Sequence, residues 1–162
     1  VDLNRSIVAS SENERQYLWK LREQIPLAEK QHGYAAKHDI SLPLSQLEDF
    51  VTNNSAELKE LEPRGYFSIF GHLGDGNLHY NFGLAGADSQ QIIELEQLVN
   101  PIVYKDIIAR GGSISAEHGI GQSKKEWLQQ FCDPVSYQLM QQLKQQLDPS
   151  NLLNPGKIFA LP

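Results

Sequence analysis

Residues 66–84 have the sequence YFSIFGHLGDGNLHYNFGL, in which two short runs rich in aromatic residues flank a glycine-rich turn. Aromatic residues favour strands, and an Asp-Gly pair favours a tight reversal of the chain. We therefore predict strands over 66–71 and 78–84, paired as an antiparallel hairpin around residues 74–77. This hairpin is the most informative stretch of the chain, and the remaining elements are placed around it.

The segments on either side alternate between helical and extended patterns. Apolar residues at helical spacing predict helices over 11–31, 45–61, 89–110, 122–131 and 134–147. Further strands are predicted over 34–42 and, very short, over 113–116, and the tail 148–162 is predicted to be loop-like. Pro101 is expected to kink or divide the helix in which it lies.

This order of elements predicts an α+β fold: a ferredoxin-like antiparallel sheet with helices packed on one face, followed by C-terminal helices. The 162 residues are enough for one domain with its own core, and we expect residues 1–162 to form it. The chain opens Val1-Asp2-Leu3, without Met or a signal-peptide pattern. We interpret this opening as a cut in a longer protein, although processing could produce the same start.

Composition narrows the class of protein. Hydrophobic residues make up 40% and charged residues 21%, as in ordinary globular domains, and no apolar run is long enough to predict a transmembrane helix. A net charge of −6 argues against a nucleic-acid-binding surface. The single Cys132 excludes an internal disulfide or a multi-thiolate metal site, and we interpret it as a structural thiol. We expect a cytoplasmic location, with peripheral membrane attachment left open.

The hairpin carries two histidines. If Asp75-Gly76 form the turn, His72 faces His79, and a four-residue loop over 74–77 keeps that pairing. Opposed residues place their Cβ atoms about 5 Å apart, so two imidazoles could share one metal ion. Asn81 projects from the same face as His79. The alternative is a tight hairpin with two incidental polar residues.

A second polar segment is Glu117-His118, between a short extended stretch and a glycine turn. A carboxylate added to two imidazoles gives three ligands with open positions, as catalytic metal sites require. His118 would then remain free for proton transfer. Alternatively, both side chains only stabilise a surface turn.

Two basic residues lie upstream. Arg22 falls on or next to the apolar stripe of the first predicted helix, and Lys37 falls within a predicted strand. Arginine suits bidentate carboxylate binding, which makes Arg22 the better candidate for an anion site. Either residue could instead be a solvated surface charge.

Together these segments resemble the C-terminal domain of FAD-linked oxidases of the vanillyl-alcohol-oxidase type. The D-2-hydroxyglutarate dehydrogenases are the most similar members, followed by D-lactate dehydrogenases and the glycolate oxidase flavin subunit. The resemblance covers nearly the whole chain. It rests on LWKLRE (18–23), DISLP (39–43), GHLGDGNLH (71–79), GSISAEHGIG (112–121) and DPSNLLNPGK (148–157).

The resemblance implies a role for each candidate residue. His72, His79 and Glu117 match a metal-binding set that holds Zn²⁺ or a similar divalent ion, with Mn²⁺, Fe²⁺ and Co²⁺ as alternatives. His118 matches the catalytic histidine. The substrate-binding residues are matched by Arg22, Lys37 and Asn81. One position departs from the pattern, because Pro26 stands where D-2-hydroxyglutarate dehydrogenases often carry a hydroxyl residue.

The resemblance also implies an activity: FAD-dependent oxidation of a D-2-hydroxy acid, such as 2-hydroxyglutarate, lactate or glycolate, to the 2-oxo acid. No glycine-rich phosphate-binding signature lies between a strand and a helix, so we expect an N-terminal domain outside this chain to hold most of the FAD. We expect this fragment alone to be inactive, and the electron acceptor stays open. The alternative function is a non-catalytic α+β metal-binding or interaction module, which needs the hairpin and Glu117 but not Arg22, Lys37 or His118.

Overall fold

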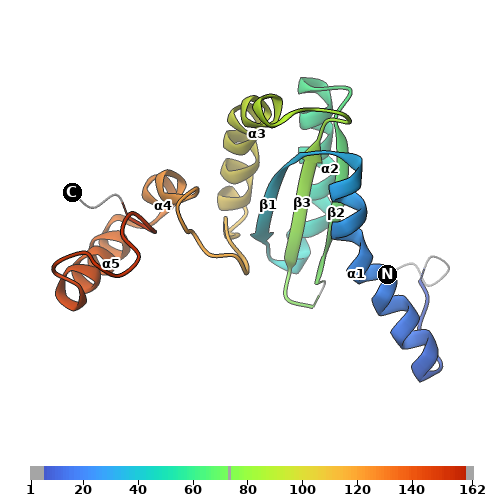
Figure 1. The fold of residues 1–162 in the computed structure, drawn as a ribbon, viewed down its shortest axis with the longest axis horizontal. Coiled ribbons are helices and arrows are strands. Elements are labelled where there is room, and N and C mark those ends of the chain that lie inside the picture. Colours follow the sequence, from blue (N-terminus) through green and yellow to red (C-terminus); the bar gives the residue numbers. More distant parts are fainter. Residues whose placement is uncertain (1–5, 73, 160–162) are drawn as a thin grey trace.

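The computed structural model describes residues 6–72 and 74–159. Helices and strands alternate along this part of the chain, with a 3-10 turn before the second long helix and two helices near the C-terminal end (Figure 1). The elements are α1 (Glu12–His32), β1 (Ala35–Ser41), η2 (Leu44–Gln46), α2 (Leu47–Leu61), β2 (Tyr66–His72), β3 (Asn77–Gly83), α3 (Ser89–Ala109), α4 (Lys125–Phe131) and α5 (Pro134–Leu147).

The three strands form one antiparallel sheet in the order β1-β3-β2. Helix α2 connects β1 to β2, and β3 lies between them, which is the split arrangement of a ferredoxin-like fold. The predicted strand over 113–116 is reduced to one antiparallel bridge between Ser41 and Ser113, on the free edge of β1. The α+β prediction is confirmed.

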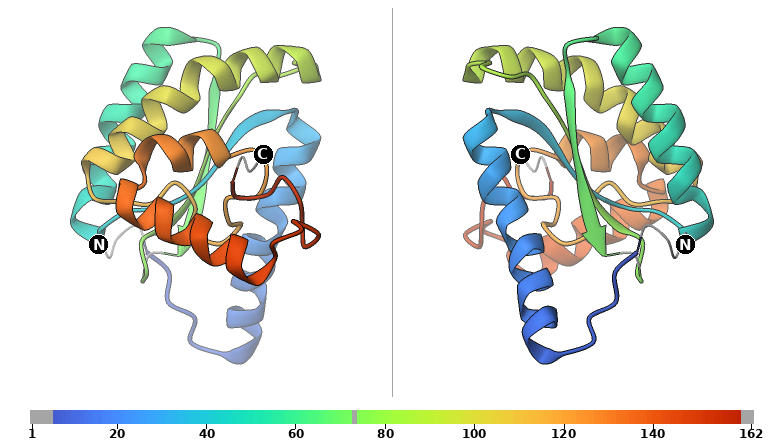
Figure 2. Two further views of the ribbon diagram at one scale, coloured as in Figure 1. Left: turned by 90° about the vertical axis from the view of Figure 1, so that its left-hand side faces the viewer. Right: turned by 90° about the vertical axis from the view of Figure 1, so that its right-hand side faces the viewer.

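The two faces of the sheet differ in polarity and in what covers them. Strand alternation puts His38, Ile40, Tyr80 and Phe82 on the core face, where all four side chains are fully buried. Helices α2 and α3 cover this face, as the left view of Figure 2 shows. The opposite face, called the open face below, carries the alternate residues of β1 and β3: Lys37, Asp39, His79 and Asn81.

Helix α1 lies on the open face, so the expectation that the helices pack on one face holds only for α2 and α3 (Figure 2). The physical reason is Glu29 of α1, which hydrogen-bonds to Lys37 and Asn81 on that face. Ser11 caps the start of α1 through a bond to the Glu14 amide, and the helix continues past Pro26.

The predicted register of the hairpin is wrong by two residues. His72 pairs with Asn77, and His79 pairs with Phe70, because β3 begins at Asn77 rather than at the predicted residue 78. The Asn77 amide donates to the Asp75 side chain, and Gly76 has a φ of 74°, so the turn closes before Asn77. A shift by two keeps His72 and His79 on the same face of the sheet, as diagonal rather than direct neighbours.

The C-terminal half contains α3, which at 21 residues is as long as α1, and two shorter helices. Pro101 lies inside α3 without dividing it, although the two halves of the helix run in different directions in Figure 1. Helix α4 packs against α3 through an edge-to-face contact of Trp127 with Tyr104. The loop prediction for the tail is confirmed over 148–159, and the free Cys132 at the end of α4 is half-buried. Among the described helices, none has the length and apolar character needed to cross a membrane.

Candidate active site

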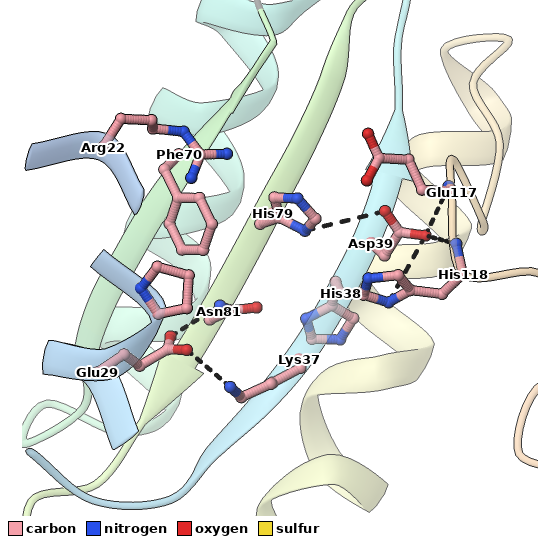
Figure 3. Close-up of a pocket in the computed structure, with 11 residues that line it drawn as sticks. Arg22, Glu29, Lys37, His38, Asp39, Phe70, His79, Asn81, Glu117 and His118 are labelled. Carbon is pink, nitrogen blue, oxygen red and sulfur yellow. Dashed lines mark hydrogen bonds and ion pairs between the residues drawn. The ribbon is translucent and has the colours of Figure 1, made fainter. Parts of the chain in front are cut away.

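A pocket of about 300 Å³ lies on the open face of the sheet, between α1, the strands and the loop after α3 (Figure 3). Six of the seven residues predicted for the site line this pocket, and His72 is the exception. The full lining is Arg22, Pro26, Glu29, Lys37, His38, Asp39, Phe70, His79, Asn81, Glu117 and His118. Segments that are far apart in sequence therefore converge as the motifs predicted.

Asp39 fixes the loop that carries Glu117 and His118. Its Oδ2 accepts hydrogen bonds from the backbone amides of three successive residues, Ala116, Glu117 and His118, at 3.2, 2.9 and 2.7 Å. Burial by itself raises the pKa of Asp39, but the hydrogen bonds from the His118 and Glu117 amides and the electrostatic influence of the His118 and Lys124 side chains outweigh it and hold that pKa below its ordinary value. The carboxylate thus acts as a fixed negative anchor for the loop.

The buried Lys124 supports the same loop from the other side. Its Nζ donates to the carbonyl oxygens of Ile114, at 2.7 Å, and Asp39, at 3.4 Å. Backbone carbonyls and a neighbouring carboxylate satisfy the ammonium group, as a buried charge requires.

Asp39 also lies beside two imidazoles. His79 Nδ1 is 3.9 Å from Asp39 Oδ1, and His118 Nδ1 is 3.8 Å from Asp39 Oδ2. One potential ligand atom from each of the three residues lies within 4.8 Å of the others. Burial lowers the pKa of His79, although Asp39 and Glu117 partly oppose the shift, so its imidazole is neutral and able to bind a metal at neutral pH.

Glu117 turns toward the end of the hairpin. Its Oε1 lies 3.4 Å from His72 Nδ1 and accepts a hydrogen bond from the Asn77 side-chain amide. Two of the three predicted metal ligands are therefore in contact, and the third, His79, lies close enough for Glu117 to affect its pKa. Asp39 Oδ1 is buried and has no hydrogen-bond partner among the described residues. This donor set of imidazoles and carboxylates fits a divalent metal ion.

Arg22 marks a different part of the pocket. Its guanidinium lies over the Phe70 ring, with the central carbon 4.7 Å from the ring centroid. The Nε atom is buried and has no hydrogen-bond partner in the described part of the chain. An unsatisfied N–H donor on a positive group that lines a pocket is suited to an anionic ligand.

Lys37 and Asn81 both bind Glu29, a residue that was not among the predicted site residues. Lys37 Nζ and the Asn81 side-chain amide both donate to the Glu29 carboxylate, each at 2.7 Å. A signal for Glu29 was present in the sequence: it follows Leu18, Arg22 and Ile25 at helical spacing, in an otherwise apolar stripe. Asp39 had a similar signal, because it alternates with Lys37 along one strand face.

Comparison with known proteins identifies the family to which the chain belongs. Residues 2–158 match the family model described as FAD linked oxidases, C-terminal domain. A mitochondrial D-2-hydroxyglutarate dehydrogenase of Rattus norvegicus is 43% identical over 151 residues, which are 93% of this chain and 27% of the relative. A D-2-hydroxyglutarate dehydrogenase of Stutzerimonas stutzeri is 37% identical, over 95% of this chain and 33% of the relative.

A further relative is a D-2-hydroxyglutarate–pyruvate transhydrogenase of Saccharomyces cerevisiae, 32% identical over 96% of this chain and 32% of its own length. The chain thus spans roughly a quarter to a third of the length of the curated relatives it matches. With a family match over residues 2–158 and a pocket built from the predicted motifs, the chain belongs to the family of FAD-linked oxidase C-terminal domains.

Proposed function

We propose that this domain forms the substrate side of the active site of an FAD-dependent dehydrogenase that oxidises a D-2-hydroxy acid to the 2-oxo acid. The observation that carries this proposal is one pocket that holds both an unpaired arginine donor, Arg22, and an exposed imidazole, His118. The oxidation requires a group that binds the substrate carboxylate and a group that accepts the hydroxyl proton. These two side chains supply both functions.

Arg22 binds the substrate carboxylate. Its planar guanidinium offers paired N–H donors, and its contact with Phe70 holds it in one orientation. Binding also satisfies the buried Nε donor, which has no partner among the described residues. Fixing the carboxylate limits the positions that C2 and its hydroxyl can take in the pocket, which is how such a contact assists the reaction.

His118 accepts the proton of the C2 hydroxyl. Its side chain is 65% exposed and lies next to the pocket, while its backbone is held by Asp39. The Nδ1 atom lies on the Asp39 side, which leaves Nε2 as the proton acceptor. The Asp39 carboxylate stabilises the imidazolium that forms, so the proton transfer costs less free energy.

His72, His79 and Glu117 are the proposed ligands of a divalent metal ion, with Zn²⁺ favoured and Mn²⁺, Fe²⁺ or Co²⁺ as alternatives. Such an ion, when bound, polarises the substrate hydroxyl and lowers its pKa. Asp39 is the weaker candidate ligand, because its Oδ2 already accepts three backbone hydrogen bonds.

FAD, when bound, supplies the two-electron oxidant. We propose that it is held mainly by residues outside 1–162, since the matched region covers only 27% of the rat relative. We also propose a cytoplasmic location, with peripheral attachment to a membrane surface as the alternative.

The test of the proposed activity is a substrate panel with the full-length flavoprotein. D- and L-2-hydroxy acids are added without oxygen, and bleaching of the flavin absorbance is followed. We expect reduction by at least one D-2-hydroxy acid and none by the L enantiomers. Failure of every acid in the panel to bleach the flavin contradicts the proposal and favours the non-catalytic metal-binding or interaction module.

The metal proposal has its own test, by elemental analysis of the purified full-length protein. We expect one divalent ion per chain in the wild type and loss of that ion in His79→Ala, His72→Ala and Glu117→Ala. Retention of metal in His72→Ala together with loss in Asp39→Ala would instead identify Asp39, His79 and His118 as the ligands. The absence of bound metal from the wild type contradicts both ligand sets.

A further inference from the structure

Glu29 stands at the end of the pocket opposite Arg22, as Figure 3 shows. Its side chain is only 2% exposed, and its two oxygens accept hydrogen bonds from Lys37 and Asn81, both at 2.7 Å. A carboxylate this deeply buried with two well-placed donors is a fixed part of the pocket wall. Phe70 lies between these two residues on the side of α1, and His79 lies farther toward Asp39 (Figure 3).

The ion pair changes the charge that the pocket offers to a substrate. The basic side chains of Arg22 and Lys37 line the pocket. The Glu29 carboxylate forms an ion pair with Lys37 and so offsets its positive charge. Asn81, the other candidate for substrate binding, has its side-chain N–H engaged by the same carboxylate. Arg22, in contrast to Lys37, has a buried N–H donor without a hydrogen-bond partner in the described part of the structure.

One unpaired arginine side chain suits one substrate carboxylate. A substrate anchored at Arg22 that carries a second carboxylate would direct it toward the end that Glu29 occupies. There it would meet a like charge in a partly buried setting, where such repulsion is strong. A hydrogen-bond donor or a short apolar end at that position meets no such penalty.

We infer that Glu29 is a specificity-determining residue that restricts the pocket to 2-hydroxy acids with a single carboxylate, such as D-lactate. This inference rests on the proposed function and narrows its substrate class. The inferred substrate class differs from that of the rat and Stutzerimonas relatives, which are D-2-hydroxyglutarate dehydrogenases, since 2-hydroxyglutarate carries two carboxylates.

The experiment compares kcat/KM for D-lactate and D-2-hydroxyglutarate in the full-length flavoprotein, for the wild type and for Glu29→Gln. Glutamine keeps the shape and one acceptor oxygen but removes the negative charge. We expect the wild type to prefer D-lactate. In Glu29→Gln the ratio should move toward D-2-hydroxyglutarate by about tenfold or more, mainly through KM, because Lys37 is released to bind the second carboxylate.

The matched control is Glu23→Gln, an exposed position on the same helix that does not line the pocket, where the ratio should stay at the wild-type value. A second comparison needs no variant: the distal amide of D-2-hydroxyglutarate has the same length without the second charge. The wild type should use this amide better than the diacid, so the inference stays testable even if Glu29→Gln folds poorly.

Two results overturn the inference while leaving the proposed function intact. The first is a wild type that prefers the diacid over both D-lactate and the amide, and the second is a ratio that Glu29→Gln leaves unchanged. Failure of all 2-hydroxy acids to reduce the flavin overturns the proposed function and this inference together.

Discussion

Asp39 connects the sheet to the loop that carries the proposed proton acceptor. One oxygen accepts the amides of residues 116–118, and the other is buried beside His79. The residue thus acts through its neighbours: it positions His118 and places negative charge next to two imidazoles. Its role can be separated from a purely structural one, because the charge and the shape of the side chain can be changed independently.

Replacing Asp39 by Asn keeps the shape and removes the charge. We expect kcat in the full-length flavoprotein to fall by about 100-fold, because the imidazolium of His118 loses its stabilising carboxylate. The dependence of kcat on pH should shift as well, which loss of packing alone would not cause. Asp49→Asn, an exposed change on α2, serves as the control. A kcat close to the wild-type value in Asp39→Asn would show that the charge is not needed.

At the residue scale, the sequence was informative where a motif was local. His79, Glu117 and His118 were placed in one site because each stands in a glycine-flanked segment, and the pocket contains all three. Asp39 was missed because the amides that it binds are 77–79 residues away in sequence. Glu29 was missed because one of its two partners, Asn81, is 52 residues away, although Lys37 is only eight residues away. The spacing that placed both residues on a favourable face did not indicate which side chains they would contact.

The β2–β3 hairpin is the element on which the position of His79 depends. Gly76 has a φ of 74°, and a Cβ added there would lie 2.0 Å from the Leu42 carbonyl oxygen. Leu42 also donates its amide to the Gly76 carbonyl, so the hairpin loop and the end of β1 are in direct backbone contact. Only glycine combines this conformation with this approach.

Gly76→Ala should therefore destabilise the chain by about 2 kcal/mol, from backbone strain and the clash together. Urea denaturation of the 162-residue chain measures the change. Gly74→Ala is the matched control in the same loop, since a Cβ there has no atom within 4 Å and its φ is not positive. Equal unfolding free energies for the two variants would refute this account of the turn.

At the element scale, the sequence predicted the type of each element well and the pairing less well. Helix α5 was predicted with both ends correct, because Pro134 and a regular apolar spacing define it. The hairpin register was wrong because the same glycines are compatible with a second strand that begins at Asn77 or at Leu78. Since the error was two residues, the face on which each histidine lies was still predicted correctly.

For the molecule as a whole, the two faces of the sheet have different roles: the core face stabilises the fold, and the open face carries the residues of the pocket. Alternate side chains of β1 point to opposite faces. The His38 side chain is fully buried on the core face, although the residue also borders the pocket, while the Asp39 side chain lies on the open face that forms the pocket. The ring nitrogens of His38 lie 2.9 Å from the Tyr80 carbonyl and 2.8 Å from the Asn100 side-chain oxygen. Burial lowers the pKa of His38 from 6.5 to about 4, although these two contacts partly oppose the shift.

This shift predicts that the folded chain loses stability in mild acid. In the unfolded state His38 binds a proton below about pH 6.5, whereas in the folded state it does so only below about pH 4. The free energy of unfolding therefore decreases as the pH is lowered from about 6.5 to about 4. The contribution from His38 should decrease by about 2 kcal/mol from pH 7 to pH 5. Urea denaturation at both pH values measures it.

The control for this prediction is His38→Gln, which keeps polar contacts but does not titrate in this range. The variant should be less stable at pH 7 but should show a smaller change in stability between the two pH values. If the wild type and His38→Gln lose the same free energy of unfolding from pH 7 to pH 5, the buried histidine is not responsible for the acid sensitivity.

At the scale of the molecule, fold class followed from the order of elements, since a helix between β1 and β2 and a hairpin after it define the split arrangement. The place of α1 did not follow from this order. Its position on the open face depends on the buried contact of Glu29 with Lys37 and Asn81, a tertiary interaction that the helix pattern does not encode.

The central claim is that His118 accepts the proton of the substrate hydroxyl. It is tested most directly by anaerobic flavin reduction in His118→Ala, a substitution that removes the imidazole and should leave the rest of the pocket unchanged. With the full-length flavoprotein and a D-2-hydroxy acid that reduces the wild type, we predict that the variant loses reduction while its metal content stays unchanged. His32→Ala, an exposed histidine of α1 outside the pocket, should reduce like the wild type. Reduction of the flavin by His118→Ala at the wild-type rate would contradict the account.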